Sequence, residues 1–301
     1  MTSVPPTDGP TTRLRLDVAY DGTGFAGWST QPGLRTVQGE LEAALAMVFG
    51  RVGPAPRLTV AGRTDAGVHA SGQVAHVDLT PAQVAVLERR RGGAAAVDPI
   101  GALAARLDGL ASRTHEIVVR RTSLAPPGFD ARFGAVWRRY EYRIADPASV
   151  HDPRRREHTL WHGRPLDVDL MAAVAEGLVG LHDWAAYCKA REGATTIREL
   201  QAFTWRRDDE GVLVGSLQAD AFCHNLVRNL VGACVAAGQG VLPVGRPAEL
   251  RDEARRGSEF TVVPPVGLTL TEIGYPPDDE LAARTERTRA RRDREDASGR
   301  P

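Results

Sequence analysis

A single carboxylate in a glycine-bounded turn is the strongest candidate for chemistry in this sequence. Asp65 lies in the stretch Arg63–His69, which reads RTDAGVH. The segments on either side, Leu58–Ala61 and Gly72–Leu79, have the composition and alternation of β-strands. An aspartate held in such a connection beside a cation suits covalent or acid-base catalysis.

The same turn also has a purely structural interpretation. Aspartate side chains commonly bond to their own backbone in an Asx-turn, which would leave Arg63 solvated. For RTDAG alone this interpretation is the more frequent one. Gly62, Gly67 and Gly72, however, permit backbone conformations and close approaches that a planar ligand entering a cleft would require. The longer sequence context has to decide between the two.

A second glycine-rich stretch matches a nucleotide-binding pattern without its context. Gly22–Gly27 satisfies G-x-G-x-x-G and follows a predicted strand. In dinucleotide-binding proteins the third glycine opens a helix whose N-terminus holds the pyrophosphate. Here Trp28–Gly33 contains Pro32 and interrupts the chain before a helix can form. We therefore expect no nucleotide cofactor.

Composition indicates a globular intracellular protein. Of the 301 residues, 42% are hydrophobic and 25% are charged, and the formal net charge is zero. No apolar run approaches the length of a membrane span, and the first twelve residues lack the features of a secretory signal, so we expect a cytoplasmic protein. Cys188, Cys223 and Cys234 are too few and too widely spaced for a disulfide framework or a zinc site. We expect reduced thiols and no metal.

The pattern of elements predicts two α+β halves and two disordered ends. In the first half, residues 13–20 alternate as a strand, and Thr36 can cap a helix with Val37 and Leu41 on its apolar face. In the second half, strands at 136–144 and 268–273 flank a helix at 222–237. Irregular mixing of strands and helices favours the α+β class. The predicted organisation is a disordered segment at 1–12, halves at 13–125 and 126–277, and a disordered charged tail at 278–301.

The extended motif around Asp65 closely resembles the active-site segment of the TruA family of tRNA pseudouridine synthases. The resembling run extends from Ala61 to Asp78. Further segments resemble that family in the same order along the chain, so that the resemblance spans about residues 13 to 277. These segments are Tyr20–Trp28, Arg35–Glu42, Phe129–Phe133, Arg138–Tyr142, Ala221–Gly232 and Gly267–Leu270.

The resemblance implies a fold and an activity. The fold would be two ferredoxin-like halves whose antiparallel sheets join around a central RNA-binding cleft. The activity would be isomerisation of uridine to pseudouridine at positions 38–40 of the tRNA anticodon stem-loop, without a cofactor. The enzyme would be a homodimer in which each tRNA contacts both subunits.

The resemblance also assigns roles to individual residues. Asp65 would be the catalytic group, and Arg228 would pair with it and keep it ionised. Tyr140 would stack on the target base, and Leu268 would line the base pocket. Arg63 could contact phosphate or orient the catalytic turn.

The residues themselves leave alternatives open for two of these roles. Tyr140 lies beside two arginines, an arrangement that offers stacking and phosphate contact together, but a cross-strand aromatic pair with Tyr142 explains it as well. Arg228 falls at the edge of the apolar arc of its helix, where a surface arginine with a buried aliphatic stem is also common. His69 and His76 are interpreted as structural residues or RNA-backbone contacts.

Some features depart from the family pattern or leave the chemistry undecided. Ser29 stands where the family usually has glutamine, and segments 92–98 and 111–114 diverge. Asp65 could attack the nucleotide covalently or remove the C2′ proton to give a glycal-like intermediate. Two other functions compete with isomerisation. A non-catalytic RNA-binding module would bind tRNA without turnover, and a nucleosidase would release free uracil.

Overall fold

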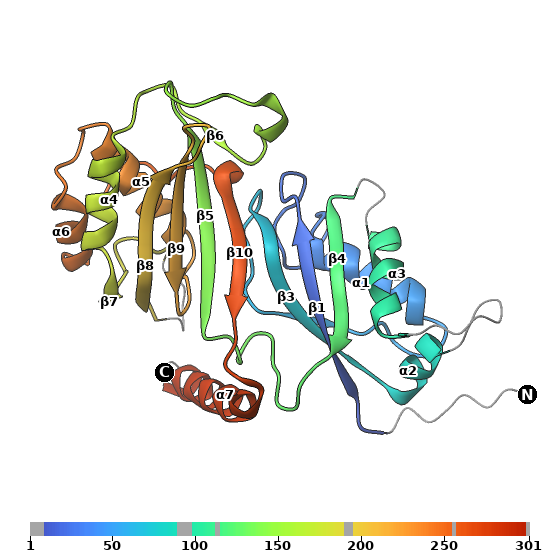
Figure 1. Cartoon of the computed structure of the whole chain (residues 1–301). Coiled ribbons are helices and arrows are strands. Elements are labelled where there is room, and N and C mark those ends of the chain that lie inside the picture. The colour runs from blue at the N-terminus through green and yellow to red at the C-terminus, as the bar shows by residue number, and fades with distance from the viewer. Residues whose placement is uncertain (1–8, 89–97, 112–114, 190–194, 255–256, 299–301) are drawn as a thin grey trace, which may run out of the picture. The chain divides into compact units, whose positions relative to one another are not determined.

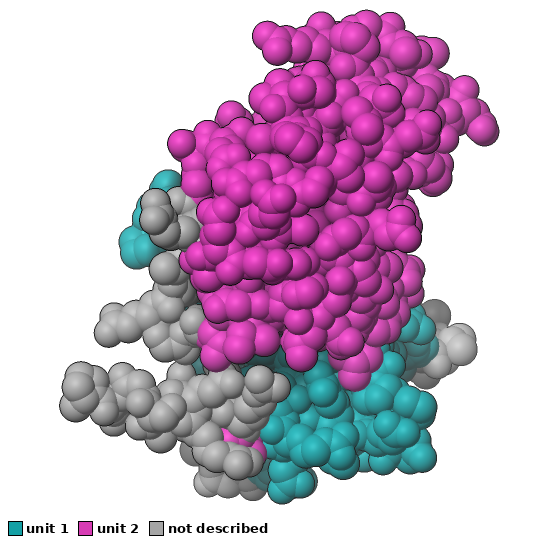
Figure 2. Space-filling model, turned by 90° about the vertical axis from the view of Figure 1, so that its left-hand side faces the viewer, with its two compact units in different colours: residues 1–135, 275–289 teal, residues 136–274, 290–301 magenta. Residues whose placement is uncertain are grey.

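The computed structural model describes residues 9–88, 98–111, 115–189, 195–254 and 257–298. It divides into two compact units, the first formed by residues 1–135 and 275–289 and the second by residues 136–274 and 290–301 (Figure 2). The boundaries of these units differ from those of the halves predicted from sequence, which are 13–125 and 126–277. The segment with the Phe129–Phe133 motif lies in the first unit, together with residues 275–289.

The first unit contains an antiparallel sheet in the order β4-β1-β3, with β2 paired to β3 (Figure 1). Helix α3 packs against β4 and against α1. The elements are β1 (Thr12–Tyr20), α1 (Val37–Phe49), β2 (Leu58–Val60), β3 (His69–Leu79), α2 (Pro81–Glu88), α3 (Gly101–Ala111) and β4 (Ile117–Leu124).

The sequence pattern explains the first two of these elements. Alternate residues of β1 from Leu14 to Tyr20 are buried, as strict alternation predicts. Thr36 caps α1 by accepting a hydrogen bond of 3.2 Å from the Gly39 amide. The buried face of α1 includes Val37 and Leu41, as predicted.

The second unit contains a sheet in the order β10-β5-β9-β8-β7. Its pairings are antiparallel except that β6 runs parallel to the end of β5. Helix α4 packs against β8, and α5 packs against α4. The elements are β5 (Trp137–Ala145), β6 (Leu160–Trp161), α4 (Val168–Gly177), β7 (Gly180–Asp183), β8 (Ile197–Arg207), β9 (Leu213–Ala219), α5 (Leu226–Gly238), α6 (Arg246–Asp252) and β10 (Leu268–Gly274).

Both units repeat one topology. With β6, β7 and the additional helices α2 and α6 left aside, each unit follows the order β-α-β-β-α-β of a ferredoxin-like fold. Among these four strands of each unit, the last lies beside the first, and the third separates the first from the second. The predicted α+β class with two ferredoxin-like halves is therefore confirmed. Among the described residues, the structure contains no helix that is both long and apolar enough to cross a membrane.

Helix α5 is buried along its length except at one residue. Every residue from Leu226 to Gly238 is buried apart from Arg228. The helix begins four residues later than predicted, because Asn225 takes a left-handed conformation with φ 66° directly before it. The aliphatic stem of such an arginine can pack against the protein while its charged end points outward.

The charged C-terminal segment is helical over most of its length, whereas we expected 278–301 to be disordered. A 3-10 turn (Asp278–Glu280) leads into α7 (Leu281–Ser298), and residues 299–301 lie outside the described range. Leu281 is 1% exposed, and Arg289 contacts Asp130 at 3.2 Å. Composition alone missed these anchors, because one buried leucine and one ion pair do not change the charge-rich average. The predicted disorder of 1–12 falls mostly on residues 1–8, which are not described, and β1 begins at Thr12.

The expectation of three reduced thiols is also corrected. The structure joins Cys188 and Cys223 in a disulfide with a Cα–Cα distance of 5.8 Å, while Cys234 is free and buried. The two cysteines are 35 residues apart in sequence. The chain after β7 lies beside the segment before α5, where the Lys189 backbone amide donates a hydrogen bond of 3.1 Å to the His224 carbonyl. Sequence spacing does not show this proximity.

A buried carboxylate stabilises the second unit. The Asp146 side chain is fully buried and accepts two hydrogen bonds from Arg207, of 3.0 and 2.8 Å. It also accepts bonds from the Ser149 hydroxyl and the Leu166 amide, both of 3.0 Å. Burial alone would raise the pKa of Asp146, but these bonds outweigh it and hold the pKa well below its usual value.

We expect Asp146→Asn to lower the free energy of unfolding by about 3 kcal/mol at pH 7, because the substitution leaves Arg207 without its counter-ion. The lowered pKa stabilises the fold above the unfolded-state value of about 3.9, and this contribution is lost as the pH falls. Urea unfolding from pH 7 to pH 3 checks both points. The variant should lose less stability over that range than the wild type, whereas the exposed Asp209→Asn variant should follow the wild type. Equal stability of the Asp146→Asn protein at pH 7 would contradict the assignment.

Candidate active site

Asp65 lies at the surface of the first unit, in the connection between β2 and β3. A 3.2 Å bond from the Val68 amide to the Asp65 carbonyl closes the turn, and Gly67 takes a φ of 75°. Asp65 and Arg63 are exposed, whereas Thr64 between them is 6% exposed. The turn therefore presents a carboxylate and a guanidinium while its central threonine points into the protein.

Backbone hydrogen bonds attach this turn to the glycine-rich loop after β1. The Trp28 amide donates to the Thr64 carbonyl at 3.0 Å, and the Gly67 amide donates to the Phe25 carbonyl at 3.2 Å. Gly27 has a φ of 97°, and a Cβ there would lie 2.9 Å from the Thr64 carbonyl oxygen. The stretch that imitates a dinucleotide motif thus permits two backbone segments to pack directly together.

A buried chain of side-chain hydrogen bonds holds the turn from below. The hydroxyls of Tyr20 and Thr64 lie 2.7 Å apart. The Gln73 amide nitrogen donates to the Tyr20 hydroxyl at 3.2 Å and to the Gly62 carbonyl at 2.8 Å. Burial raises the pKa of Tyr20 to about 12, so its hydroxyl remains neutral and able to donate. Residues on both sides of Arg63 are thereby fixed.

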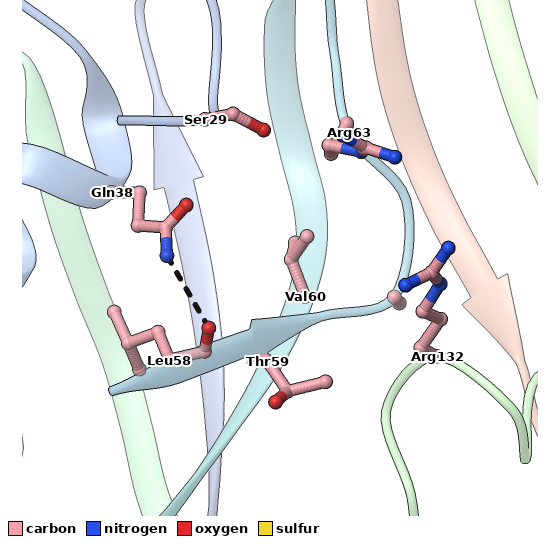
Figure 3. A pocket seen from close by; sticks show the side chains of 8 residues that line it. Ser29, Gln38, Leu58, Thr59, Val60, Arg63 and Arg132 are labelled. Atoms are coloured by element: carbon pink, nitrogen blue, oxygen red, sulfur yellow. Dashed lines mark hydrogen bonds between the residues drawn. The ribbon is translucent and has the colours of Figure 1, made fainter. Parts of the chain in front are cut away.

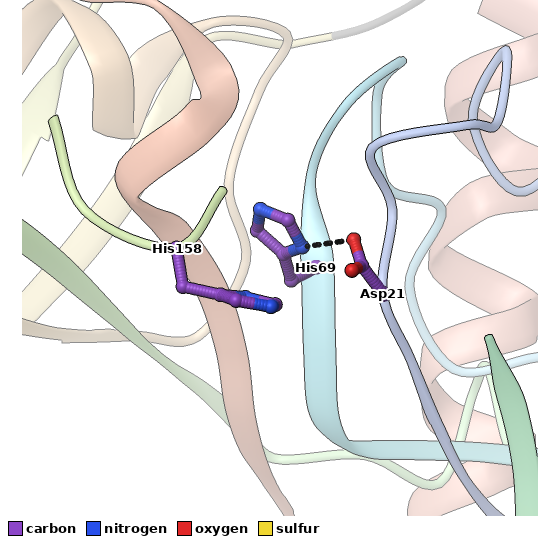
Figure 4. A group of neighbouring side chains, drawn as sticks. All are labelled: Asp21, His69 and His158. Carbon is purple, nitrogen blue, oxygen red and sulfur yellow. Dashed lines mark ion pairs between the residues drawn. The ribbon is translucent and has the colours of Figure 1, made fainter. Parts of the chain in front are cut away.

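His69, at the start of β3, bonds to the glycine-rich loop after β1 from the other side of the turn. Its Nδ1 accepts a 3.0 Å bond from the Gly22 amide and lies 3.2 Å from a carboxylate oxygen of Asp21 (Figure 4). The ring is 2% exposed. A Cβ on Gly22 would lie only 2.0 Å from the Val68 carbonyl oxygen, so no other residue type fits there without movement. These contacts favour the structural interpretation of His69.

Tyr140 and Leu268 lie on neighbouring strands of the second unit. Tyr140, on β5, is 8% exposed and packs against Phe222 with ring centroids 5.1 Å apart and planes at 86°. Phe222 is therefore an aromatic partner of Tyr140, and Tyr142 is two residues further along the same strand. Leu268, on β10, is 5% exposed and faces Tyr142 in the register between the strands.

Arg228 is held at its place in the second unit by two acceptors. Its Nε donates to the Val263 carbonyl at 2.7 Å, and Nη1 lies 3.5 Å from the Asn225 side-chain oxygen. Burial raises the pKa of Tyr142, and the nearby positive charge of Arg228 opposes that shift. The guanidinium is thus oriented by the protein, as a residue that contacts substrate would need to be.

The structure places the predicted site residues in two groups. Asp65 and Arg63 share one turn of the first unit, and Tyr140, Arg228 and Leu268 lie in the second unit. Sequence reasoning missed the buried residues that hold the turn, Tyr20, Thr64 and Gln73. One signal for them was available in the sequence, since strand alternation places the polar Gln73 on the same face as Ala75. In the structure Gln73 is completely buried.

Comparisons with known proteins identify the family of the chain. A family model described as tRNA pseudouridine synthase matches residues 174–276. Proteins named tRNA pseudouridine synthase A are 59% identical in Leifsonia xyli over 281 residues (93% of this chain, 98% of the relative), 54% in Frankia casuarinae over 284 (94% and 96%) and 51% in Streptomyces griseus over 278 (92% and 93%). With such identity along nearly the whole chain, the protein belongs to the tRNA pseudouridine synthase A family.

Proposed function

We propose that this protein isomerises uridine to pseudouridine in tRNA, at positions 38–40 of the anticodon stem-loop, without a cofactor. The observation that carries the proposal is the exposed carboxylate of Asp65 on a turn whose backbone and neighbouring side chain are fixed by buried hydrogen bonds. Membership of the family supports the substrate class. The exact uridines follow from the family resemblance of the sequence motifs.

The reaction requires a carboxylate and no redox chemistry. The N1 glycosidic bond breaks, the base rotates, and a new bond forms from C5 to the sugar. C5 then loses its proton and N1 gains one, so that the product is an isomer of the substrate. Asp65 in its ionised form can attack the nucleotide or accept the C2′ proton. Either route needs the carboxylate at a fixed position relative to the sugar, which a turn held on both sides provides.

Residues of the second unit are proposed to bind the substrate. Tyr140 would stack on the target base, offsetting the few kcal/mol that removal of a base from its stack costs. The ring of Phe222 packs against that of Tyr140 in an edge-to-face arrangement. Leu268 would supply an apolar wall, and Arg228 a fixed positive charge. Arg63 of the first unit would contact phosphate.

The assembly and location of the protein are part of the same proposal. We infer a homodimer in which each tRNA contacts both subunits, and a cytoplasmic location, where tRNA is modified. The family resemblance supports the dimer, and the proposed tRNA substrate supports the location. Light scattering of the purified protein with and without tRNA tests the dimer directly.

Asp65→Ala is expected to reduce pseudouridine formation by about 10³-fold or more, because it removes the proposed nucleophile or base. Binding of tRNA should stay within about threefold of the wild type, since the turn is held by groups other than the carboxylate. Tritium release from 5-tritiated uridine in tRNA and filter binding measure the two quantities. The exposed Asp209→Ala variant serves as the control.

Three outcomes would contradict this assignment. Normal turnover by Asp65→Ala would exclude the residue. Tight tRNA binding by the wild type with no tritium release would indicate a non-catalytic RNA-binding protein. Release of free uracil in place of the isomer would indicate a nucleosidase. Full activity in excess chelator is expected, and loss of activity there would show a metal requirement.

Thr64→Val tests whether the buried hydroxyl pair positions the catalytic turn. The valine has nearly the same shape but leaves the Tyr20 hydroxyl without this partner, so we expect about 1–2 kcal/mol loss of unfolding free energy. The kcat should fall about tenfold. The KM should rise less, because, of the proposed substrate-binding residues, only Arg63 adjoins the altered position. Thr64→Ser, which keeps the hydroxyl, should restore most of kcat. A valine variant with wild-type kcat would show that the pair stabilises the fold without positioning Asp65.

A further inference from the structure

A hollow of about 290 Å³ opens on the first unit beside the catalytic turn (Figure 3). The strand β2 and the alanine after it form one wall, which is apolar except for a threonine. Two arginines, a serine and a glutamine complete the hollow. No carboxylate is among its lining residues in the described part of the chain. The lining residues are Ser29, Gln38, Leu58, Thr59, Val60, Ala61, Arg63 and Arg132.

The loop that carries Arg132 is rigidly fixed to its own unit. The buried carboxylate of Asp130 accepts hydrogen bonds from the amides of Arg132 and Phe133, at 2.8 and 2.9 Å. The Ala131 amide donates to Nδ1 of His76 at 3.0 Å. Burial, and then the charge of Arg13, lowers the pKa of His76 to about 4, so the ring remains an acceptor at neutral pH. The backbone at Arg132 is therefore set before any ligand arrives.

The guanidinium of Arg132 is also supported along its side. It lies over the Phe133 ring, 5.4 Å from the centroid. Arg132 itself is half-buried. A guanidinium that is held by its own loop and by a ring loses little further freedom when it binds an anion.

Arg63 reaches the same hollow from the catalytic turn. Its neighbours on both sides, Gly62 and Thr64, are held by the Gln73 and Tyr20 side chains. The guanidinium groups of Arg63 and Arg132 lie on the same side of the hollow (Figure 3). Two like charges facing one hollow repel each other, and an anion placed between them removes that repulsion.

The remaining walls define the kind of anion. Gln38 is fixed as part of the wall, because its Nε2 donates to Glu42 at 2.8 Å and lies 3.4 Å from the Leu58 carbonyl oxygen. Ser29 offers a hydroxyl, and Leu58 and Val60 offer an apolar surface. A volume of about 290 Å³ suits one phosphate with its sugar and is too small for a stem of paired RNA.

We propose that this hollow binds one backbone phosphate of the RNA substrate, held between Arg63 and Arg132. The inference rests on the proposed function, which supplies RNA as the ligand. Arg63 is two residues from Asp65, so the phosphate belongs to a nucleotide close to the target uridine. Arg132 is a substrate-positioning residue that the roles implied by the family resemblance do not include.

The test measures tRNA affinity as a function of salt concentration for wild type, Arg132→Ala, Arg132→Gln, Arg132→Lys and the double variant Arg63→Ala with Arg132→Ala. Arg120→Ala, which removes an exposed cation on β4, is the matched control. Arg132→Gln retains an extended polar side chain and guards against collapse of the loop. Thermal unfolding of each variant shows that it is folded at the assay temperature.

We expect about a tenfold loss of tRNA affinity in Arg132→Ala and Arg132→Gln at moderate salt, with partial recovery in Arg132→Lys. The slope of log affinity against log salt should become shallower by about 0.7 to 0.9 in the double variant, as expected for loss of one phosphate contact. Arg120→Ala should show neither change. Wild-type affinity and slope in the double variant, or equal losses in Arg120→Ala, would overturn the proposal.

Two further measurements distinguish failure of the phosphate site from failure of the proposed reaction. Millimolar inorganic phosphate should compete with tRNA for the wild type more strongly than chloride at equal ionic strength, and this difference should vanish in the double variant. Competition that persists there would place the phosphate elsewhere and overturn the assignment. The binding measurement does not depend on turnover. If the wild type forms no pseudouridine but shows the expected slopes, the proposed reaction is wrong and the phosphate site is still supported.

Discussion

The buried hydroxyl contact between Tyr20 and Thr64 is the interaction on which the candidate active site depends. A single hydrogen bond contributes only about 1 kcal/mol net, but a buried hydroxyl without a partner costs about 1–3 kcal/mol. Tyr20 ends β1, Gln73 lies within β3, and Thr64 belongs to the turn between β2 and β3. Strand pairing thus fixes Tyr20 and Gln73, and their hydrogen bonds restrict the position of Thr64. Asp65 and Arg63 are exposed because Thr64 between them points inward.

Backbone packing adds a second constraint to the same turn. Gly22 and Gly27 bring the loop after β1 so close to the turn that a Cβ at either position would contact backbone atoms at 2.0 and 2.9 Å. Hydrogen bonds from backbone amides to the carbonyls of Thr64 and Phe25 then join the two segments. The glycines therefore have a physical role that is unrelated to nucleotide binding. Similar glycine spacing in a dinucleotide-binding protein allows approach to a pyrophosphate, whereas here it allows approach to protein.

Local patterns in the sequence were sufficient for the elements but not for their long-range partners. Alternation predicted β1, and the cap at Thr36 predicted α1, because both signals lie within one element. The start of α5 was wrong by four residues, since nothing in the local composition shows that Asn225 turns left-handed. The tail from 278 was wrongly expected to be disordered, because one buried leucine anchors a segment whose composition is otherwise charged.

The proposed catalytic carboxylate and the residues around it differ in how far the sequence revealed them. Asp65 was identified because its motif is contiguous. Arg228 was identified only through the family resemblance, because its helix alone favoured an ordinary surface arginine. Arg228 is the one residue of α5 that is not buried, which fits both the proposed role and a surface arginine. Arg132 was not assigned a role, because its importance depends on Asp130 and His76 fixing its loop, and these contacts join residues up to 55 positions apart.

The fold holds the turn of Asp65 in place before any substrate binds. Hydrogen exchange at the Trp28 and Gly67 amides of the unliganded protein measures this most directly, because these amides donate across the contact between the turn and the loop. We predict that both exchange almost as slowly as the amides of β1 and β3. Exchange at the rate of an open surface loop would show that the turn is ordered only by substrate, and would contradict the account.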